Sequence, residues 1–207
     1  MTRIVSGAAG GRTLRVPGTG TRPTSERVRE ALFSRLEHLG AVAGARVLDL
    51  YAGSGALGLE AASRGAATVT FVESSRAAAD VCRANAAATR LSRLHVVVER
   101  AERFVDRPAA SPWDLVLIDP PYELAEADLA RVLRGLAGGG RERDRGAEPR
   151  LAEDAIVVVE RSTRSPEPTW PAAMSRTEER RYGETVIWFA SPDAGVGPAD
   201  PVAPGIP

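Results

Sequence analysis

Apolar and polar positions follow one another along this chain in two distinct patterns. Short runs in which almost every residue is apolar indicate strands buried on both faces, as in a parallel sheet. Longer stretches with apolar residues three and four positions apart indicate helices. The strands are expected at residues 46–50, 68–73, 94–98, 113–118 and 155–160, and the helices at residues 25–38, 56–64, 75–90 and 126–136. This alternation of strand and helix predicts an α/β domain with helices on both faces of a mostly parallel sheet.

The two ends of the chain depart from this alternation. Near the N-terminus, Ile4-Val5 and Leu14-Arg15-Val16 flank a glycine-rich turn and predict a hairpin, which is followed by the first helix. Near the other end, residues 176–182 and 185–190 flank Gly183-Glu184 and predict a second hairpin. These two strands complete a seven-stranded sheet whose last strand is antiparallel.

Domain boundaries are expected where the composition changes. A basic hairpin arm covers residues 1–23, and the α/β domain covers residues 24–190. Residues 138–149 consist of glycine and alternating charge, which predicts a flexible loop inside the domain. Residues 191–207 are rich in Pro, Gly and Ala and have few core-forming side chains, which predicts a disordered tail.

The charge is unevenly distributed. The formal net charge of the 207 residues is zero, and every one of the 27 basic residues is arginine. Residues 1–36 hold seven arginines against Glu26 and Glu30, a net charge of +5, so the rest carries −5. A basic segment on such a body is a candidate nucleic-acid surface. An ordinary solvated face explains the same pattern, and charge alone does not separate the two.

Several classes of protein are disfavoured by features that the sequence lacks. Cys82 is the only cysteine, so we expect neither an intrachain disulfide nor a cysteine-built metal site. It lies among alanines in a helical stretch and is expected to fill the core. No apolar run is long enough to cross a membrane and none has the features of a signal peptide. A cytoplasmic protein without metal or membrane partners is therefore expected.

A glycine-rich segment, Asp49-Leu-Tyr-Ala-Gly-Ser-Gly-Ala-Leu-Gly58, follows the first buried strand and opens a helix. Its glycine spacing matches the dinucleotide fingerprint, in which glycines permit a tight turn and close approach of a ligand to the backbone. Glu73 ends the next strand, where an acidic group binds ribose hydroxyls. Asp49 would repel a pyrophosphate, so the loop favours a ligand with an ammonium group, such as S-adenosylmethionine, over NAD. Alternatively, Asp49 is a helix-capping or turn carboxylate.

The third strand ends at Glu99-Arg100-Ala101-Glu102, where the adenine ring of such a ligand is expected. A backbone amide at Ala101 can serve adenine. It is equally consistent with the pattern that Ala101 merely begins a helix.

The strongest chemical signal is Asp119-Pro120-Pro121-Tyr122, which directly follows the apolar run at residues 115–118. The carboxyl end of a buried strand is where α/β sheets place their ligands. The prolines cannot continue the strand, the carboxylate and free carbonyls accept hydrogen bonds, and the tyrosine offers a flat face. This set predicts a site that holds an amino group attached to an aromatic ring, with a structural turn carboxylate as the alternative.

These residues resemble a known family. Asp119–Tyr122 together with the Asp49 loop is similar to class I S-adenosylmethionine-dependent amino-methyltransferases. The run Arg22-Pro-Thr-Ser-Glu-Arg27-Val-Arg29-Glu-Ala-Leu-Phe33 resembles the signature of the bacterial 16S rRNA guanine(966)-N2-methyltransferase family, the RsmD-like proteins. The opening hairpin and the turn at Tyr182-Gly183 are similar too. Arg100 departs from the family, which usually has a small polar or acidic residue there.

The resemblance implies a Rossmann-like fold and methyl transfer from S-adenosylmethionine to N2 of a guanine in 16S rRNA or the assembling small ribosomal subunit. The implied catalytic residues are Asp119, Pro120, Pro121 and Tyr122. The implied cofactor residues are Thr24, Asp49, Tyr51, Gly53, Ser54, Gly55, Glu73, Ala101, Glu102 and Asp119. The implied RNA contacts are Arg3, Arg12, Arg15, Arg22, Arg27 and Arg29.

Three other functions remain open at this point. The catalytic motif alone would also suit methylation of adenine N6 in DNA or RNA. A non-catalytic RNA-binding assembly factor could keep the same fold, although the intact motif speaks against it. An NAD-dependent oxidoreductase is disfavoured by Asp49 and by the lack of an evident hydride-transfer site.

Overall fold

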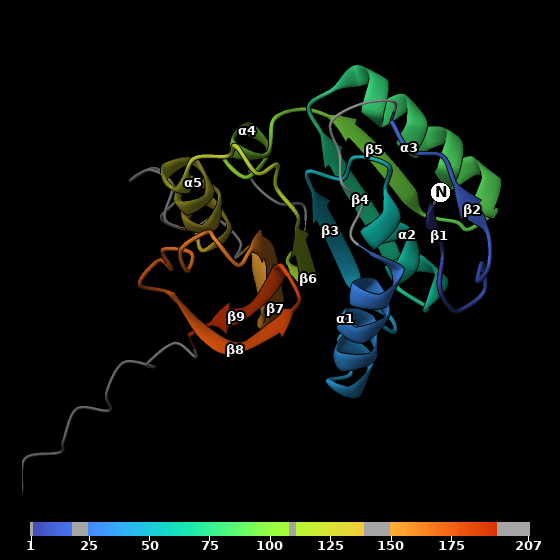
Figure 1. The fold of residues 1–207 in the computed structure, drawn as a ribbon. Helices are drawn as coiled ribbons and strands as arrows, with labels where there is room; N and C mark the ends of the chain where they lie inside the picture. The colour runs from blue at the N-terminus through green and yellow to red at the C-terminus, as the bar shows by residue number, and fades with distance from the viewer. Residues whose placement is uncertain (1, 18–24, 108–110, 139–149, 194–207) are drawn as a thin grey trace, which may run out of the picture.

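The computed structural model describes residues 2–17, 25–107, 111–138 and 150–193. Over these residues a seven-stranded sheet is covered by helices, and a two-stranded hairpin precedes it (Figure 1). The sheet strands are β3 (Arg46–Leu50), β4 (Thr68–Glu73), β5 (Leu94–Val98), β6 (Trp113–Ile118), β7 (Leu151–Ser162), β8 (Met174–Tyr182) and β9 (Thr185–Pro192). The helices are α1 (Glu26–His38), α2 (Ala56–Ser63), α3 (Arg76–Thr89), α4 (Ala101–Phe104) and α5 (Glu126–Leu136).

The sheet has the expected Rossmann-like arrangement. Its strands lie in the order β5-β4-β3-β6-β7-β9-β8. The first five strands in this order are parallel, and β9 is antiparallel to both of its neighbours. The prediction of a mostly parallel seven-stranded sheet with an antiparallel last strand is therefore confirmed.

The last strand of the described residues, β9, lies inside the sheet, and its hairpin partner β8 forms the edge. In β9, residues 186–190 are buried, so this strand needs a neighbour on each side. In β8 the sequence is strongly charged and mostly exposed, which suits an edge strand because charged side chains discourage pairing with another chain. Composition thus explains which strand of the hairpin is internal.

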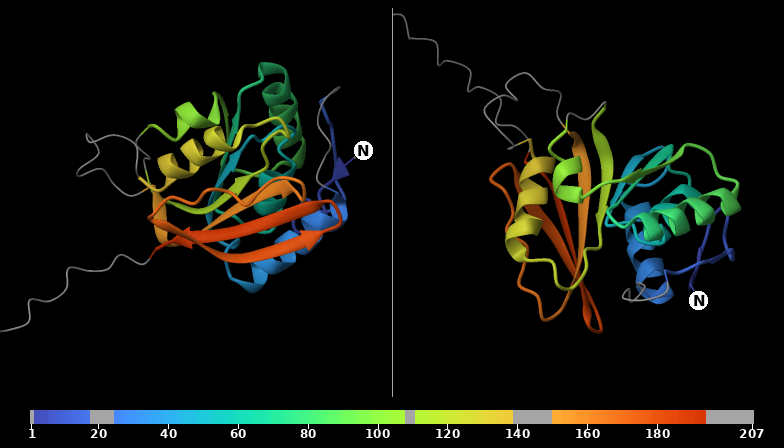
Figure 2. Two further views of the ribbon diagram at one scale, coloured as in Figure 1. Left: turned by 60° about the vertical axis from the view of Figure 1, so that its left-hand side comes forward. Right: turned by 90° about the horizontal axis from the view of Figure 1, so that it is seen from above.

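Helices cover both faces of the sheet, as Figure 2 shows from two sides. One hydrophobic core joins the sheet to α1, α2 and α3, and a second joins it to α4 and α5. Successive strand residues alternate between these cores. Leu117 packs in the first and Ile118 in the second. Cys82 is fully buried in the first core, which confirms the prediction that it fills the interior.

The N-terminal hairpin is packed on the domain. Its strands are β1 (Thr2–Arg3) and β2 (Thr13–Leu14). The predicted hairpin is present, but Ile4-Val5 directly follow β1, and only Leu14 of the second predicted run lies in a strand. Ile4 and Leu14 are 0% and 2% exposed and belong to the core under α1 and α2. The hairpin therefore contributes to the same hydrophobic core as the domain.

Most predicted element boundaries agree with the structure. Ser25 caps α1, since its side chain accepts a hydrogen bond from Val28 N. The chain is in β9 as far as Pro192, two residues beyond the predicted end of the domain. Most of the predicted loop at 138–149 and of the predicted tail at 191–207 lies outside the described residues.

Candidate active site

Four carboxylates lie at the carboxyl ends of adjacent parallel strands. Glu73, Asp49, Asp119 and Glu160 belong to or directly follow β4, β3, β6 and β7. The neighbouring residue of each strand packs toward α4 and α5: Val72, Leu50, Ile118 and Val159. Because successive side chains in a strand point to opposite faces, the four carboxylates share the face of α1, α2 and α3.

Asp49 is the most deeply buried of the four, with 1% of its surface exposed. Burial raises its pKa to about 8, opposed by the hydrogen bond from Gly58 and reinforced by the charges of Asp119 and Glu73. Its Oδ2 accepts that bond from Gly58 N, in the first turn of α2, at 2.9 Å. This contact is the helix-capping role considered as an alternative. Pairing with an ammonium group stays a prediction. The raised pKa fits it, because a bound cation would offset the burial and the neighbouring negative charges and so favour the ionised form of Asp49.

The glycine loop has the tight geometry that its sequence indicates. Gly53 and Gly55 have φ angles of +54° and +81°, a backbone region that other residues rarely adopt. A Cβ atom on Gly58 would lie 2.4 Å from the Phe71 ring. The loop is braced by Glu73, whose Oε2 accepts from Gly53 N at 2.9 Å and whose Oε1 accepts from Ser75 N at 2.7 Å. Each carboxylate oxygen has a second lone pair, so Glu73 keeps the capacity to accept from a ribose, and that contact stays a prediction.

A cavity of about 470 Å³ lies beside this loop, within the usual size range of small-molecule sites. Tyr51, Ala101 and Glu102, three of the predicted cofactor residues, line it. The Tyr51 hydroxyl donates to Glu102 Oε1 at 3.0 Å, and burial raises the pKa of Tyr51, so the phenol stays protonated. Ala101 begins α4, which confirms the structural interpretation of that residue, and its contact with adenine stays a prediction.

Glu99 lines the same cavity, and the sequence reasoning did not assign it a role. Its Oε1 pairs with Arg103 and Arg107, whereas Oε2 is buried and has no hydrogen-bond partner in the described part of the chain. An unpaired buried acceptor is costly unless something binds it. A carboxylate directly after a predicted parallel strand, a signal similar to the one that identified Glu73, could have identified Glu99.

The Asp-Pro-Pro-Tyr motif separates this cavity from a smaller hollow. Pro121 lines the large cavity, whereas Asp119, Pro120 and Tyr122 line the hollow. The hollow has a volume of about 10 Å³, space for about one water molecule. Tyr122 is 62% exposed, an unusually open position for an aromatic side chain. A flat ring can therefore stack on Tyr122 with its polar edge toward the hollow.

The remaining walls of the hollow come from the end of β7, which the sequence reasoning did not include. They are Glu160, Arg161 and Ser162. Arg161 donates to Leu124 O at 3.4 Å and pairs with Glu126, and its side chain is 5% exposed. Its Nε and Nη1 have no hydrogen-bond partner among the described residues. The sequence offers one signal for these three residues, which is their place at the end of a strand. It does not show that they lie beside Asp119, because β6 and β7 are distant in sequence.

One predicted RNA contact is wrong. Arg29 is 0% exposed and lies 3.5 Å from Glu60, measured from Nε to Oε2. Its Nη2 donates to Thr2 Oγ1 at 3.2 Å and also to the Arg3 carbonyl. Arg29 precedes Phe33 by four positions and so lies on the buried stripe of α1, a signal available in the sequence. It holds the hairpin to the domain and cannot reach a phosphate.

The other predicted RNA contacts in the described residues are at the surface. Arg12, Arg15 and Arg27 are exposed. Arg3 is exposed and paired with Glu26 at 3.0 Å. Arg22 and the predicted cofactor residue Thr24 lie outside the described residues.

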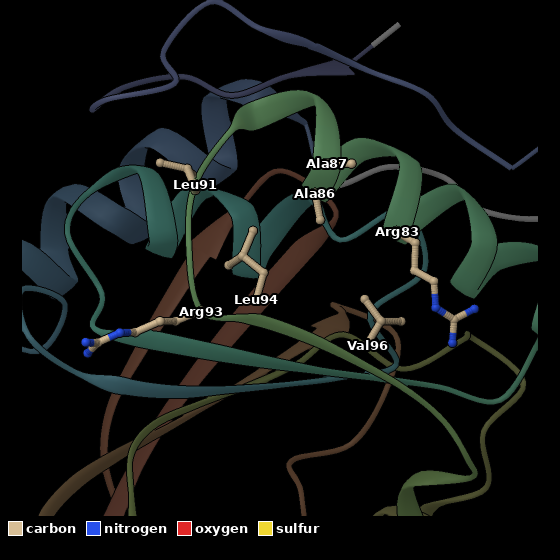
Figure 3. A pocket seen from close by; sticks show the side chains of 7 residues that line it. All are labelled: Arg83, Ala86, Ala87, Leu91, Arg93, Leu94 and Val96. Atoms are coloured by element: carbon tan, nitrogen blue, oxygen red, sulfur yellow. The ribbon is translucent and has the colours of Figure 1, made fainter.

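A second open cavity, of about 390 Å³, lies between α3 and β5. Figure 3 shows Leu94 and Val96 on its floor, with Arg83 and Arg93 at opposite ends. It has no carboxylate in its walls and shares no residue with the cavities beside the motif. The carboxylates of the candidate active site therefore lie away from this cavity, at the carboxyl end of the sheet.

Two kinds of feature are absent from the described residues. These residues contain no group of three or more His, Cys, Asp or Glu side chains arranged to hold a metal ion. None of their helices is both long and apolar enough to cross a membrane.

Comparison with known proteins identifies the family. Residues 2–191 match the family described as conserved hypothetical protein 95. The chain is 36% identical over 183 residues to ribosomal RNA small subunit methyltransferase D of Escherichia coli K12, covering 88% of this chain and 85% of that protein. The protein of the same name in Haemophilus influenzae is 36% identical over 132 residues, 62% of this chain and 67% of that one.

Solved structures agree with this match. The Escherichia coli protein yhhF aligns with a TM-score of 0.78 and 33% identity, over 93% of this chain and 98% of that chain. A hypothetical protein of Thermus thermophilus aligns with a TM-score of 0.74 and 30% identity, over 91% and 98%. Because the match spans nearly the whole described chain, the protein belongs to the conserved hypothetical protein 95 family, the RsmD family that its N-terminal signature and Asp-Pro-Pro-Tyr motif resemble.

Proposed function

We propose that this protein transfers a methyl group from S-adenosylmethionine to the exocyclic N2 of a guanine in 16S rRNA, as naked RNA or in the assembling small subunit. The observation that carries the proposal is the position of Asp119–Tyr122 between a cofactor-sized cavity and a small polar hollow. The relatives named ribosomal RNA small subunit methyltransferase D support rRNA as the substrate. A ribosomal substrate would also place the protein in the cytoplasm.

The large cavity and the neighbouring glycine loop together fit S-adenosylmethionine. Glu99 lines the cavity, whereas the glycine loop, Asp49 and Glu73 lie beside it. The cofactor supplies a methyl group activated by a sulfonium centre. The Gly53–Gly55 loop would carry its amino-acid part close to Asp49, and Glu73 would accept from the ribose hydroxyls. The unpaired Glu99 Oε2 is suited to accept a hydrogen bond from the adenine amino group, which gives this buried oxygen a partner.

The motif would prepare the target nitrogen. The lone pair of a guanine N2 is delocalised into the ring, so the nitrogen is a weak nucleophile. Asp119 and the Pro120 carbonyl would accept hydrogen bonds from the two N–H groups of N2. This orientation would direct the nitrogen lone pair toward the cofactor side of the motif. The same two acceptors stabilise positive charge developing on the nitrogen, and Asp119 can take the proton that it loses. Tyr122 would stack on the base after it leaves its own stack.

The walls of the hollow favour guanine over adenine. Next to its amino group guanine carries an N1–H donor, with the O6 acceptor beyond it on the same edge, whereas adenine carries a bare N1 acceptor next to its amino group. Glu160 would accept from guanine N1–H, and the unpartnered N–H groups of Arg161 would donate to O6. A carboxylate facing the bare N1 of adenine would be repelled, which disfavours the alternative of N6 methylation.

Deleting the gene and mapping the modified nucleosides of 16S rRNA by mass tests the proposal. We expect a single N2-methylguanosine to disappear and to return when the purified protein and S-adenosylmethionine are added. Loss of N6-methyladenosine instead would favour the adenine alternative. An unchanged set of nucleosides would favour a non-catalytic assembly factor.

The base preference has its own test. Glu160→Gln offers an amide that can donate to adenine N1, so the preference for guanine over adenine should fall about tenfold. Paired RNA oligonucleotides that differ only at the target base measure it. Glu123→Gln, which changes an exposed carboxylate next to the motif, is the matched control and should leave the preference unchanged.

A further inference from the structure

Asn85 links two segments of the molecule that the proposed function uses for different purposes. It lies on α3 and is 3% exposed, so its carboxamide is directed into the protein rather than to solvent. An interior carboxamide requires hydrogen-bond partners, and here they come from two distant parts of the chain. One is the end of the N-terminal hairpin, and the other is the glycine loop.

The contacts of Asn85 use both its donors and its acceptor. Its Oδ1 accepts from Arg15 N at 2.9 Å, and its Nδ2 donates to Arg15 O at 2.9 Å. The same Nδ2 donates to Ser54 O at 2.8 Å. Both backbone polar groups of Arg15 are thus bonded to one side chain, which also bonds the residue between Gly53 and Gly55.

The two hydrogen-bond partners of Asn85 belong to the proposed sites of two different ligands, the cofactor and the RNA. Ser54 is in the loop proposed to carry the cofactor, and its neighbour Gly53 is held by Glu73. Arg15 follows β2, and its exposed side chain is a proposed phosphate contact. The other end of the hairpin is fixed separately, because Glu60 accepts from Val5 N at 2.7 Å and from Ser6 N at 3.0 Å. A displacement of Arg15 by RNA would therefore be transmitted to Ser54 through one carboxamide.

We propose that Asn85 is a positioning residue that couples RNA binding on the hairpin to cofactor binding in the glycine loop. The inference rests on the proposed function, because it needs both ligands. RNA that orders Arg15 would fix the Ser54 carbonyl and so prepare the loop, and the cofactor would favour the RNA-binding arrangement by the same factor, since coupling between two sites is reciprocal.

The test compares binding of S-adenosylhomocysteine, the demethylated cofactor, with and without a 16S rRNA fragment. In the wild type the RNA should raise the affinity about fivefold or more, at the lower end of typical couplings. Asn85→Ala should reduce that factor to near one. Thr89→Val is the matched control, because Thr89 is another buried polar residue of α3 whose hydroxyl bonds only to Ala86 O and Leu91 N among the described residues.

Each outcome decides the inference. The inference is overturned if Asn85→Ala shows the same coupling factor as Thr89→Val and the wild type. It is also overturned if the wild type binds the two ligands independently. A wild type that binds neither ligand would instead remove the proposed function, and the inference with it. If Asn85→Ala does not fold, hydrogen exchange of the wild type carries the test: RNA alone should slow exchange at the Ser54 and Gly55 amides, and no change there overturns the inference.

Discussion

Two clusters of buried charge lie on the same face of this sheet, and they are built differently. Where the hairpin meets the domain, Glu60 is surrounded by Arg29, Arg64 and two backbone amides. At the carboxyl end of the strands, Asp49 is surrounded by other carboxylates, and its pKa is raised to about 8 by burial and by its neighbours. The first cluster pairs opposite charges, whereas the second gathers like charges.

The difference separates a structural cluster from a functional one. Opposite charges around Glu60 compensate each other without a ligand, so that cluster serves to fix the hairpin. Like charges around Asp49 destabilise the folded protein until something cationic binds or the carboxyl takes up a proton. Repulsion of this kind is common at functional sites, where it favours the ligand.

The largest expected effect is on stability at the structural cluster. Glu60→Ala leaves the buried Arg29 without its counter-charge, so the free energy of unfolding should fall by about 4 kcal/mol. Urea denaturation followed by circular dichroism measures it. Glu37→Ala is the matched control, because Glu37 pairs with the same Arg64 but is 47% exposed, and should cost less than about 1 kcal/mol. Equal losses in the two variants would contradict the distinction.

The next effect is on catalysis at the functional cluster. Asp119→Ala should reduce the rate of methyl transfer by about 10²–10³-fold, because one acceptor at the developing positive charge is lost. Binding of S-adenosylmethionine, measured by calorimetry, should change much less. Glu123→Ala removes a neighbouring exposed carboxylate and should leave the rate unchanged. Normal turnover in Asp119→Ala would show that this carboxylate does not act on the amino group.

Asp49→Asn should separate stability from function. The pKa of Asp49 is about 8 in the folded protein against 3.8 as its ordinary value, so the folded state holds a proton that the unfolded chain releases between those pH values. The wild type therefore loses stability as pH rises from about 4 to about 8. The variant lacks this loss and should be more stable by roughly 2 kcal/mol at pH 8 and above.

The measurement for Asp49→Asn is thermal unfolding across pH 5 to 9. The melting temperature of Asp49→Asn minus that of the wild type should grow with pH and level off near pH 8. The variant should also bind the cofactor more weakly than the wild type. A difference that is independent of pH would mean that Asp49 is already ionised in the free protein.

The smallest expected effect is at the surface. Reversing the charge of Arg12 or Arg15 should weaken RNA binding about fivefold and lower the salt dependence of the affinity by about one ion per contact, with cofactor binding unchanged. Titration with labelled RNA at several salt concentrations measures both. Arg134→Glu, on α5 at the opposite face, is the control, and an equal loss there would remove the hairpin from the RNA surface.

Local pattern predicted most elements because their signals are short in range. The strands at 46–50, 68–73, 94–98 and 113–118 match the structure residue for residue, since short runs rich in apolar and β-branched residues between turns favour strands. The glycine loop and the Asp-Pro-Pro-Tyr motif were found in the same way, because each is one continuous stretch that follows a buried strand.

The roles of single charged residues were less predictable. Arg29 was assigned to RNA because it is in a basic segment, but it lies on the apolar stripe of α1 and meets Glu60 of α2. Its burial depends on an acid in another helix, a relation that composition does not reveal. Burying an arginine without such a partner is very costly, so whether Arg29 is buried depends on Glu60 as well as on Arg29 itself.

The sequence by itself therefore determined the α/β fold, the two motifs at the strand ends and the family. Only the tertiary structure decided which groups meet there. It brought Glu160 and Arg161 to the hollow beside Asp119, left Glu99 Oε2 without a described partner, and set Asn85 between Arg15 and Ser54. The physical reason is range, since a motif is fixed by neighbours along the chain, whereas a hydrogen bond across 31 or 70 positions depends on how helices and strands pack.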